Sequence, residues 1–301
     1  MRVAASHPRV VALVPAFTAA EFIAATLDTL AAQSHPNLEI LVSDDASPDG
    51  TAAICERYAA RDARFRLIRQ PRNLGWTGNV NALLGEARGD YFCIAGHDDR
   101  LEPGYVERCV AALEANPRAV LAFTDLMLVK ADGRRELKSY AVLDGVSDRG
   151  RRARRIARRT GAHWIPYRGV FRAPAARAVG GLRRHGAGEF SADWPWLLQL
   201  SLLGEFVRIP EPLYTKISRP QGLSRDWNRR KRSWSAVTGS AMAAVSRAEV
   251  PSREKLALYA NLGGTLAWRR LRAKLRSVAG GERSPRSPAP GARPPAQARG
   301  A

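Results

Sequence analysis

The sequence lacks the features that mark secreted and membrane-spanning proteins. It has only three cysteines, Cys55, Cys93 and Cys109, an odd number without metal-ligand spacing. We therefore expect reduced core thiols in a cytoplasmic protein rather than a disulfide framework. The N-terminus has no charged segment followed by a long apolar one, so no signal peptide is expected. No apolar run approaches the roughly 18 residues of a spanning helix. Any membrane contact would therefore be peripheral, at the inner face of the membrane.

The sequence also lacks glycine-rich phosphate-binding motifs, and it has no excess of acidic residues. Neither G-x-G-x-x-G nor G-x-x-x-x-G-K-[ST] occurs in the sequence, so a bound nucleotide would have to be held by a metal and by side chains. The net charge is +20, and most of the basic residues are arginine. This charge favours polyanions, namely nucleic acid, anionic lipid surfaces or phosphorylated substrates. Hydrophobic residues make up 45% of the chain, which is enough for a sizeable core and excludes wholesale disorder.

Apolar runs alternate with helical patterns over the first hundred residues. Strands are expected at residues 10–14, 38–42, 65–68 and 91–95. Helices are expected from about residue 22, at 51–60 and at 78–87. This β-α-β order predicts an α/β fold with a parallel sheet and right-handed crossovers.

Two of the expected strands end in acidic doublets. Asp44 and Asp45 follow the second strand, and Asp98 and Asp99 follow the fourth. In an open α/β sheet, ligands bind beyond the carboxyl ends of the strands. Adjacent carboxylates in that place favour a divalent cation such as Mg²⁺ or Mn²⁺, which in turn bridges nucleotide phosphates. The alternative is a polar turn in which Asp98 or Asp99 caps a helix that begins near Pro103.

The order and spacing of these motifs resemble those of the inverting GT-A glycosyltransferases of family 2. The resemblance runs unbroken over about the first 110 residues and continues more weakly over residues 169–224. It is carried by VPAFTAAE at 14–21, QSHPNLEI at 33–40, SDDASPDGT at 43–51, NLG at 73–75, ARGDY at 87–91 and HDD at 97–99. It implies a Rossmann-like GT-A fold, a mostly parallel sheet flanked by helices, and a metal-dependent transfer with inversion from a nucleotide sugar. The implied donor is UDP-linked, and the acceptor is a saccharide or a lipid-linked hydroxyl in cell-surface polysaccharide or glycolipid synthesis.

The resemblance assigns the nucleotide base and the metal to particular residues. Pro15, Phe17 and Asp45 match positions that hold the base, with Asp45 accepting a hydrogen bond from the pyrimidine N3–H. Phe17 stands where Tyr is more usual, and its alternative is an ordinary core aromatic. Asp99 is implied as the direct metal ligand, with Asp98 beside the ribose or sugar and as the second candidate ligand.

Three further residues complete the implied donor site. Glu21 and Asn73 lie in matching motifs. Arg219 stands where many members carry a His, and its guanidinium could bind diphosphate oxygens but could not ligate a metal while charged. The two nearby asparagines, Asn79 and Asn81, are too close in sequence to share a helical face. At most one of them is expected to reach the ligand, and the alternative for both is hydrogen bonding within the protein.

An inverting displacement needs a general base near the acceptor hydroxyl. Asp193 matches an Asp of the family, whereas Ala192 stands where Glu is common. Asp193 is therefore the predicted base, and its alternative role is to cap the helix that follows. Because this departure leaves the alignment open, Glu189 is the reserve candidate.

The second half of the chain is strongly basic. The segment Arg149 to Arg159 holds seven arginines, which would cover most of the circumference of a helix. It is expected to be either a solvated loop or an electropositive lid over phosphate groups. The spacing of Gln221, Arg225 and Trp227 does not form the QxxRW element of processive synthases, so a single addition is expected.

The sequence predicts three regions. Residues 1–225 would form the catalytic domain, with a donor half at about 1–110 and an acceptor half at about 111–225. Residues 226–278 would form basic helices that either contact an anionic membrane or pack against the catalytic domain. Residues 279–301 are expected to be disordered.

Two other functions fit parts of the sequence. The charge would suit a protein that binds nucleic acid or anionic surfaces, but no recognisable module with interleaved aromatics is present, so no specific nucleic acid is expected. A nucleotidyltransferase of related topology would need a glycine-rich phosphate loop after the first strand, and residues 14–21 contain no glycine.

Overall fold

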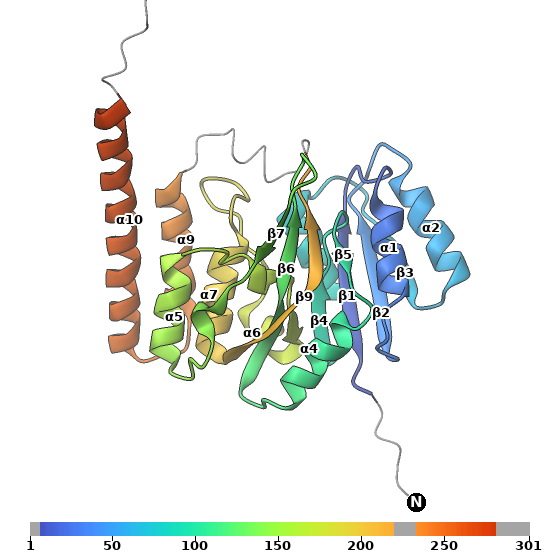
Figure 1. The fold of residues 1–301 in the computed structure, drawn as a ribbon, viewed down its shortest axis with the longest axis horizontal. Coiled ribbons are helices and arrows are strands. Elements are labelled where there is room, and N and C mark those ends of the chain that lie inside the picture. The colour runs from blue at the N-terminus through green and yellow to red at the C-terminus, as the bar shows by residue number, and fades with distance from the viewer. Residues whose placement is uncertain (1–6, 220–232, 281–301) are drawn as a thin grey trace, which may run out of the picture.

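The first half of the chain forms the parallel part of the sheet. A computed structural model describes residues 7–219 and 233–280. The elements of this half are β1 (Val10–Ala16), α1 (Ile23–Ala31), β2 (Leu38–Asp44), α2 (Thr51–Arg61), β3 (Phe65–Arg69), α3 (Gly75–Glu86) and β4 (Tyr91–Ile94). β1 pairs in parallel with β2 and with β4, and β2 pairs in parallel with β3. The carboxyl ends of these strands therefore lie along one edge of the sheet, as predicted (Figure 1).

The second half adds mostly antiparallel pairs to the same sheet. It consists of β5 (Arg100–Leu101), α4 (Tyr105–Glu114), β6 (Ala119–Val129), β7 (Arg135–Lys138), η1 (Ala141–Leu143), α5 (Arg149–Arg158), η2 (Ile165–Arg168), β8 (Val170–Arg172), α6 (Ala173–Val179), α7 (Asp193–Leu203) and β9 (Glu205–Ile217). The strand order is β3-β2-β1-β4-β8-β6-β9-β5, with β7 paired to β6. β8 runs antiparallel to both β4 and β6, and β9 is parallel to β6. The sheet is thus mixed beyond β4 rather than mostly parallel. The sequence could not show this, because a short buried strand carries no signal for its direction.

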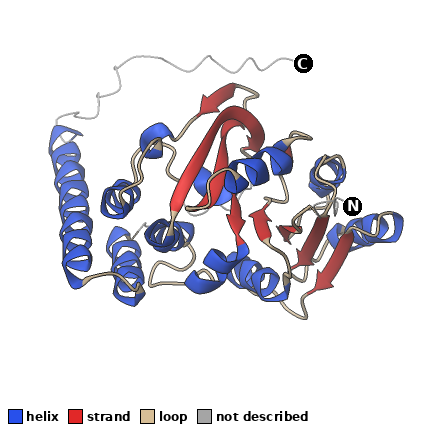
Figure 2. Ribbon diagram, turned by 90° about the horizontal axis from the view of Figure 1, so that it is seen from below, coloured by secondary structure: helices blue, strands red, loops and turns tan. Residues whose placement is uncertain are grey.

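Two helices follow β9 and cover one end of the molecule. α9 (Trp234–Arg247) packs against α7, and α10 (Ser252–Gly280) packs against α5 and α9. Figure 2 shows these helices side by side, with α10 outermost. Val237, Ala241, Leu258 and Leu262 join the same hydrophobic core as the sheet. The helices predicted within 226–278 therefore pack on the domain before them. The predicted boundary at 225 and the tail beyond 280 lie outside the described residues.

The arginine-rich segment is a helix, so the alternative of a solvated loop is wrong. In α5 the apolar residues Ala153, Ile156 and Ala157 form one buried face. Arg152 is also buried, and its Nε donates to the backbone oxygen of Ser201 at 2.8 Å. Three apolar positions at helical spacing suffice to bury one face, because the long arginine side chains can reach solvent or a hydrogen-bond acceptor from the flanks.

The three cysteines lie in the core. Cys55, Cys93 and Cys109 are buried and unbridged, as the sequence predicts. Burial in apolar surroundings raises the pKa of the Cys55 thiol to about 12. These thiols are therefore packing residues rather than nucleophiles or metal ligands.

Candidate active site

The predicted donor residues come together where β1, β2 and β4 end. Phe17 follows β1, Asp45 follows β2, and the His97-Asp98-Asp99 turn follows β4. The Nδ1 atom of His97 lies 2.9 Å from the backbone oxygen of Pro15. The hydroxyl of Thr26 in α1 donates to the backbone oxygens of His97 and Asp99. β1 and α1 thereby fix the position of the acidic turn.

Asp99 lies inside a closed network of cationic and phenolic groups. Its side chain is completely buried. Its Oδ2 accepts from Tyr214 Oη at 2.8 Å and from Arg168 Nε at 3.2 Å, and its Oδ1 is 3.7 Å from Lys216 Nζ. Burial alone would raise the pKa of Asp99, but Lys216, Arg168 and the Tyr214 hydroxyl hold it below its usual value. Asp99 is therefore an ionised residue whose charge is balanced within the protein.

Gly96 makes this network possible. A Cβ atom at position 96 would lie 2.6 Å from Oδ2 of Asp99, which is closer than real contacts allow. The Gly96 N–H faces the hydroxyl of Tyr214 at 3.3 Å. The glycine that ends the fourth strand thus leaves room for the Asp99 carboxylate, which a larger residue would displace.

Asp98 is more accessible than Asp99, although the charges of Arg168 and Arg100 also act on it. It is partly exposed, and within residues 7–219 and 233–271 its carboxylate makes no hydrogen bond or ion pair. The alternative of a helix cap is also wrong, because α4 begins at Tyr105 and Gly104 precedes it. Direct ligation of a metal by Asp99 stays a prediction: its Oδ1 is buried without a hydrogen-bond partner, but Arg168 and Lys216 beside it would repel a cation. The exposed partner of the doublet, Asp98, is the better candidate.

The described residues fit a divalent cation only together with its substrate. They contain no cluster of three or more His, Cys, Asp or Glu side chains arranged to hold a metal. A magnesium ion in a nucleotide site commonly uses one or two carboxylates, with substrate phosphates and water as its other ligands. The unpartnered Asp98 carboxylate meets that minimal requirement.

Arg219 lies beside the acidic turn. Its guanidinium carbon is 4.2 Å from the centre of the Phe22 ring, and Phe22 stacks on His97 with 5.5 Å between ring centres. The Nε of Arg219 is buried without a hydrogen-bond partner. Because Phe22 and His97 link Arg219 to the turn that carries Asp98, both sit at the end of the site predicted for the diphosphate.

Phe17 and Asp45 occupy different settings at the predicted base-binding end. The Phe17 side chain is 42% exposed, so the alternative of an ordinary core aromatic is wrong. Asp45 is only 2% exposed, and its Oδ1 accepts from the Leu74 N–H at 2.7 Å. Burial raises the pKa of Asp45, and the backbone N–H groups of Leu74 and Gly75 oppose that rise. Asp45 thus ties the loop before α3 to the end of β2.

The remaining residues considered for the donor site either hydrogen-bond to the backbone of the protein or make no contact with the site. Asn73 is exposed, and its Oδ1 accepts from the Gly75 N–H at 2.9 Å, where α3 begins. Glu21 is exposed and makes no contact among the described residues that ties it to the site. Asn79 donates to the backbone oxygen of Ser43, and Asn81 is paired with the backbone of Leu182. Both interior asparagines therefore hold elements together, as their alternative reading predicts.

Asp193 lies near Arg168, the cationic partner of Asp99. It is the first residue of α7, and Arg168 and Arg159 both lie close enough to lower its pKa, although burial raises that pKa overall. Arg168 is also the partner of Asp99. One guanidinium therefore links the predicted base to the acidic turn.

Arg159 fixes the start of α7. It ends α5 in a left-handed conformation, with a φ of 51°, and its Nη2 donates to Ser191 Oγ at 2.8 Å. Its guanidinium carbon lies 4.9 Å from the ring centre of Trp194 and 4.6 Å from that of Trp234. Through these contacts α5 and α9 both hold the end of α7 that carries Asp193.

Glu189 is not placed to act as the reserve base. Its carboxylate accepts from the N–H groups of Trp76 and Thr77 and pairs with Arg184 at 2.9 Å. These are the unpaired N–H groups of the first turn of α3, which a carboxylate satisfies well. This contact also explains why α3 begins at Gly75, three residues before the predicted start.

We expect Glu189→Ala to act on stability. Losing charged hydrogen bonds at the start of α3 should lower the free energy of unfolding by about 2 kcal/mol, measured by urea denaturation. The acid side of the pH profile of glycosyl transfer should keep its shape. An unchanged unfolding midpoint combined with a complete loss of transfer would instead restore Glu189 as a base.

Comparisons with known proteins identify the family. The profile of Glycosyl transferase family 2 matches residues 11–179, which is more than half of the chain. The chain belongs to this family. The succinoglycan biosynthesis protein ExoO of Rhizobium meliloti is 35% identical over 127 residues, covering 42% of this chain and 36% of that protein. The putative teichuronic acid biosynthesis glycosyltransferase TuaG of Bacillus subtilis is 29% identical over 126 residues, covering 42% and 50%. The chain spans about half or less of the length of these relatives.

Solved structures share the fold. S. aureus TarS 1–349 in complex with UDP-GlcNAc aligns with a TM-score of 0.64 and 15% identity, covering 85% of this chain and 72% of that one. The mannosyltransferase PcManGT from Pyrobaculum calidifontis, in complex with GDP-Man and Mn²⁺, aligns with a TM-score of 0.56 and 18% identity, covering 92% and 81%. These likenesses confirm the predicted GT-A fold.

The sequence did not point to several residues of this family 2 site. Arg168, Tyr214 and Lys216 surround Asp99, and Arg159 steadies the end of α7 that carries Asp193. All four come from the second half of the chain, more than 50 residues from the acidic turn. Tyr214 lies in the weaker part of the resemblance, residues 169–224, but spacing alone could not show that its hydroxyl reaches Asp99.

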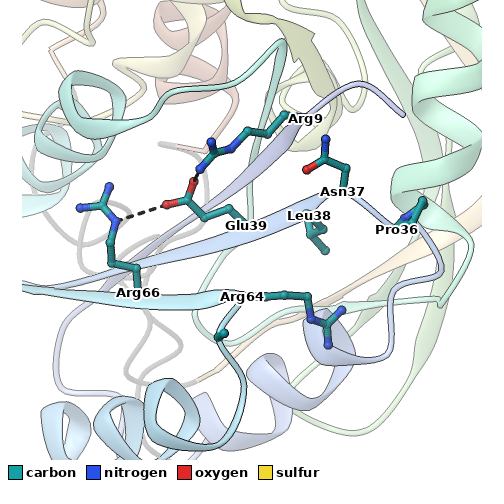
Figure 3. Close-up of a pocket in the computed structure, with 8 residues that line it drawn as sticks. Arg9, Pro36, Asn37, Leu38, Glu39, Arg64 and Arg66 are labelled. Carbon is teal, nitrogen blue, oxygen red and sulfur yellow. Dashed lines mark hydrogen bonds and ion pairs between the residues drawn. The ribbon is translucent and has the colours of Figure 1, made fainter. Parts of the chain in front are cut away.

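A cavity at the opposite edge of the sheet does not belong to the family 2 site. It is lined by residues at the amino ends of β1, β2 and β3 (Figure 3). Arg9 and Arg66 both pair with Glu39, and Arg64 pairs with Asp62. Because carboxylates already balance these arginines, the cavity offers no strong site for an anionic ligand.

Proposed function

We propose that this chain transfers a glycosyl group from a UDP-linked sugar to an acceptor hydroxyl, with inversion and with the help of Mg²⁺ or Mn²⁺. The observation that carries the proposal is the contrast within the acidic doublet. Asp98 is open to a ligand, whereas Asp99 is balanced by Arg168 and Lys216. The comparisons support the donor class, since TarS and PcManGT are in complex with nucleotide sugars.

The bond changes in this proposal are those of a single displacement at the anomeric carbon of the donor sugar. Asp193 takes the proton of the acceptor hydroxyl as the hydroxyl oxygen attacks the anomeric carbon. The bond between that carbon and the β-phosphate oxygen breaks, and the nucleoside diphosphate leaves. Arg219 binds diphosphate oxygens, and Asp98 holds the divalent cation. When bound, this cation stabilises the negative charge that develops on the leaving group.

The base of the nucleotide would lie against Phe17, at the other end of the site. The exposed ring offers a stacking face, and Asp45 and Pro15 lie next to it at the ends of β2 and β1. Glu21 and Asn73 remain predicted donor contacts from the resemblance. The acceptor is proposed to be a saccharide or a lipid-linked sugar of cell-envelope polysaccharide synthesis, because ExoO and TuaG are named for such pathways. The proposal is a single addition of sugar to this acceptor, since the sequence lacks the QxxRW spacing of processive synthases.

Calorimetric titration tests the donor assignment. We expect UDP to bind in the presence of Mn²⁺, and GDP and dTDP to bind more weakly. Phe17→Ala should weaken UDP binding by about fivefold to tenfold through lost stacking, with little change in stability because the ring is exposed. Leu137→Ala, which removes an apolar side chain that is also exposed, from β7, is the matched control. Absence of binding by all three nucleotides would refute the proposal.

A further inference from the structure

The outer face of α10 is exposed and largely apolar. Eight residues at helical spacing share this face, which we name the α10 stripe, and all are exposed: Arg253, Leu256, Ala257, Ala260, Gly264, Ala267, Trp268 and Leu271. At 3.6 residues per turn they fall within an arc of roughly 120° and extend over roughly 27 Å. Only one of them is charged.

This arrangement is the reverse of an ordinary surface helix. A helix on a globular protein usually turns its polar face outward. In α10, Leu258 and Leu262 are buried against the domain, yet Leu256 is 70% exposed, Trp268 56% and Leu271 48%. The helix is therefore apolar on two sides, and we expect another molecule or surface to cover the outer side.

Positive charge borders the stripe. Arg270 is exposed on one flank. On the other flank lies α5, which is joined to α10 by the ion pair between Arg149 and Glu254 at 2.7 Å. Arg151 and Arg158 of α5 are exposed.

Charge and composition select among the possible occupants. Residues 281–301, which follow α10, contain no Leu, Ile, Val, Met, Phe, Tyr or Trp, so this segment has no large apolar side chain to cover the stripe. A second copy would bring another net charge of +20 against a basic border. An anionic lipid surface attracts the border and accepts the apolar residues.

We propose that the α10 stripe docks on an anionic lipid bilayer. No helix among the described residues combines the length and hydropathy that a membrane span requires, so α10 would lie in the interface. Its C-terminal end is on the same side of the molecule as the carboxyl ends of β1 and β2 (Figure 1). The bilayer would lie beside α10, at the opposite end of the molecule from β1 and β2 (Figure 1). The inference deepens the proposed function and rests on it in one respect, namely that the acceptor is lipid-linked.

Vesicle flotation of the full chain tests the docking. The protein should float with phosphatidylcholine–phosphatidylglycerol vesicles and not with phosphatidylcholine alone. Leu256→Ser combined with Leu271→Ser should reduce partitioning by about tenfold or more. Leu137→Ser combined with Leu203→Ser removes two exposed leucines outside the stripe, from β7 and α7, and should float as the unmodified protein does. Circular dichroism checks that each variant is folded.

Three results would overturn the proposal. The unmodified protein could fail to float with either vesicle. The stripe variant could float as well as the unmodified protein, which would leave charge alone as the cause. Sedimentation could show a dimer that only the stripe variant loses, which would assign the stripe to a second copy. UDP titration of the same preparations separates the two proposals. The stripe variant should bind UDP as the unmodified protein does. If the unmodified protein did not bind UDP, the donor assignment would be refuted whatever the vesicles show.

Discussion

Asp98→Ala is expected to abolish the Mn²⁺-dependent part of UDP binding and to reduce glycosyl transfer by at least about a hundredfold, while the protein keeps its thermal stability. The carboxylate is partly exposed and has no partner among the described residues, so removing it leaves no buried group unpaired. Its loss would remove the one open carboxylate of the acidic turn, and with it the charge stabilisation that a metal supplies to the leaving group. Calorimetry with and without Mn²⁺, together with a thermal melt, measures both effects.

Asp99→Ala provides the contrast to this variant. It leaves Arg168 and Lys216 facing each other in a buried site, so we expect a loss of about 3 kcal/mol or more in the free energy of unfolding. The ion pairs hold the pKa of Asp99 below 3.8. Their contribution is therefore fully present at neutral pH and is lost as the pH falls through the lowered value. Asp99→Asn should fall between the two variants, because it keeps the shape but loses the charge.

The comparison between the two variants decides which carboxylate binds the metal. If Asp99→Ala remained as stable as the unmodified protein and lost only metal-dependent binding, the direct ligand would be Asp99, as the family resemblance implies. If Asp98→Ala kept full Mn²⁺-dependent UDP binding, Asp98 would have no role at the metal. Tyr214→Phe, which removes one hydrogen bond from Asp99, should destabilise the protein modestly and leave metal-dependent binding intact.

The parallel half of the fold was predictable from the sequence because its signals are local. Buried runs such as residues 10–14 and 38–42 alternate with helical patterns, and the acidic doublets follow the strands directly. The sheet edge at which ligands bind then follows from topology alone. The same reasoning placed Asp45 and the Asp98-Asp99 doublet at one edge, which the structure confirms.

Long-range contacts were not predictable in this way. The sequence cannot show that Arg168 and Lys216 converge on Asp99, so the family resemblance alone made Asp99 the predicted metal ligand and Asp98 the second candidate. Glu189 was the reserve candidate for the base, and its structural role could not be seen in the sequence because its contacts with Trp76 and Thr77 span more than 100 residues. The seven arginines of Arg149 to Arg159 made the segment appear too polar for a packed helix, although three apolar positions bury one face of α5. For Asp99 and Glu189 the contacting residues lie far away in the chain. For α5 the apolar residues are local but are outnumbered by arginines.

Asp193→Asn is expected to lower kcat for glycosyl transfer by about 10²- to 10⁴-fold while UDP binding stays unchanged. The amide keeps the size of the side chain at the start of α7 but cannot accept the acceptor proton. In the unmodified protein, kcat/KM should rise with pH through the pKa of Asp193, which burial places above its usual value of 3.8, because only the ionised carboxylate acts as a base.

Arg159→Gln tests that pH dependence independently. The charged or titratable groups that act on Asp193 are Arg159, Arg168 and Tyr167, and the two arginines lower its pKa. Removing the charge of Arg159 should shift the acidic limb of the kcat/KM profile to higher pH. Arg158→Gln, at an exposed position of α5, should leave that limb in place. An acidic limb that persisted unchanged in Asp193→Asn, with transfer retained, would show that another group accepts the proton, because the only carboxylate at the start of α7 would then be absent from the reaction.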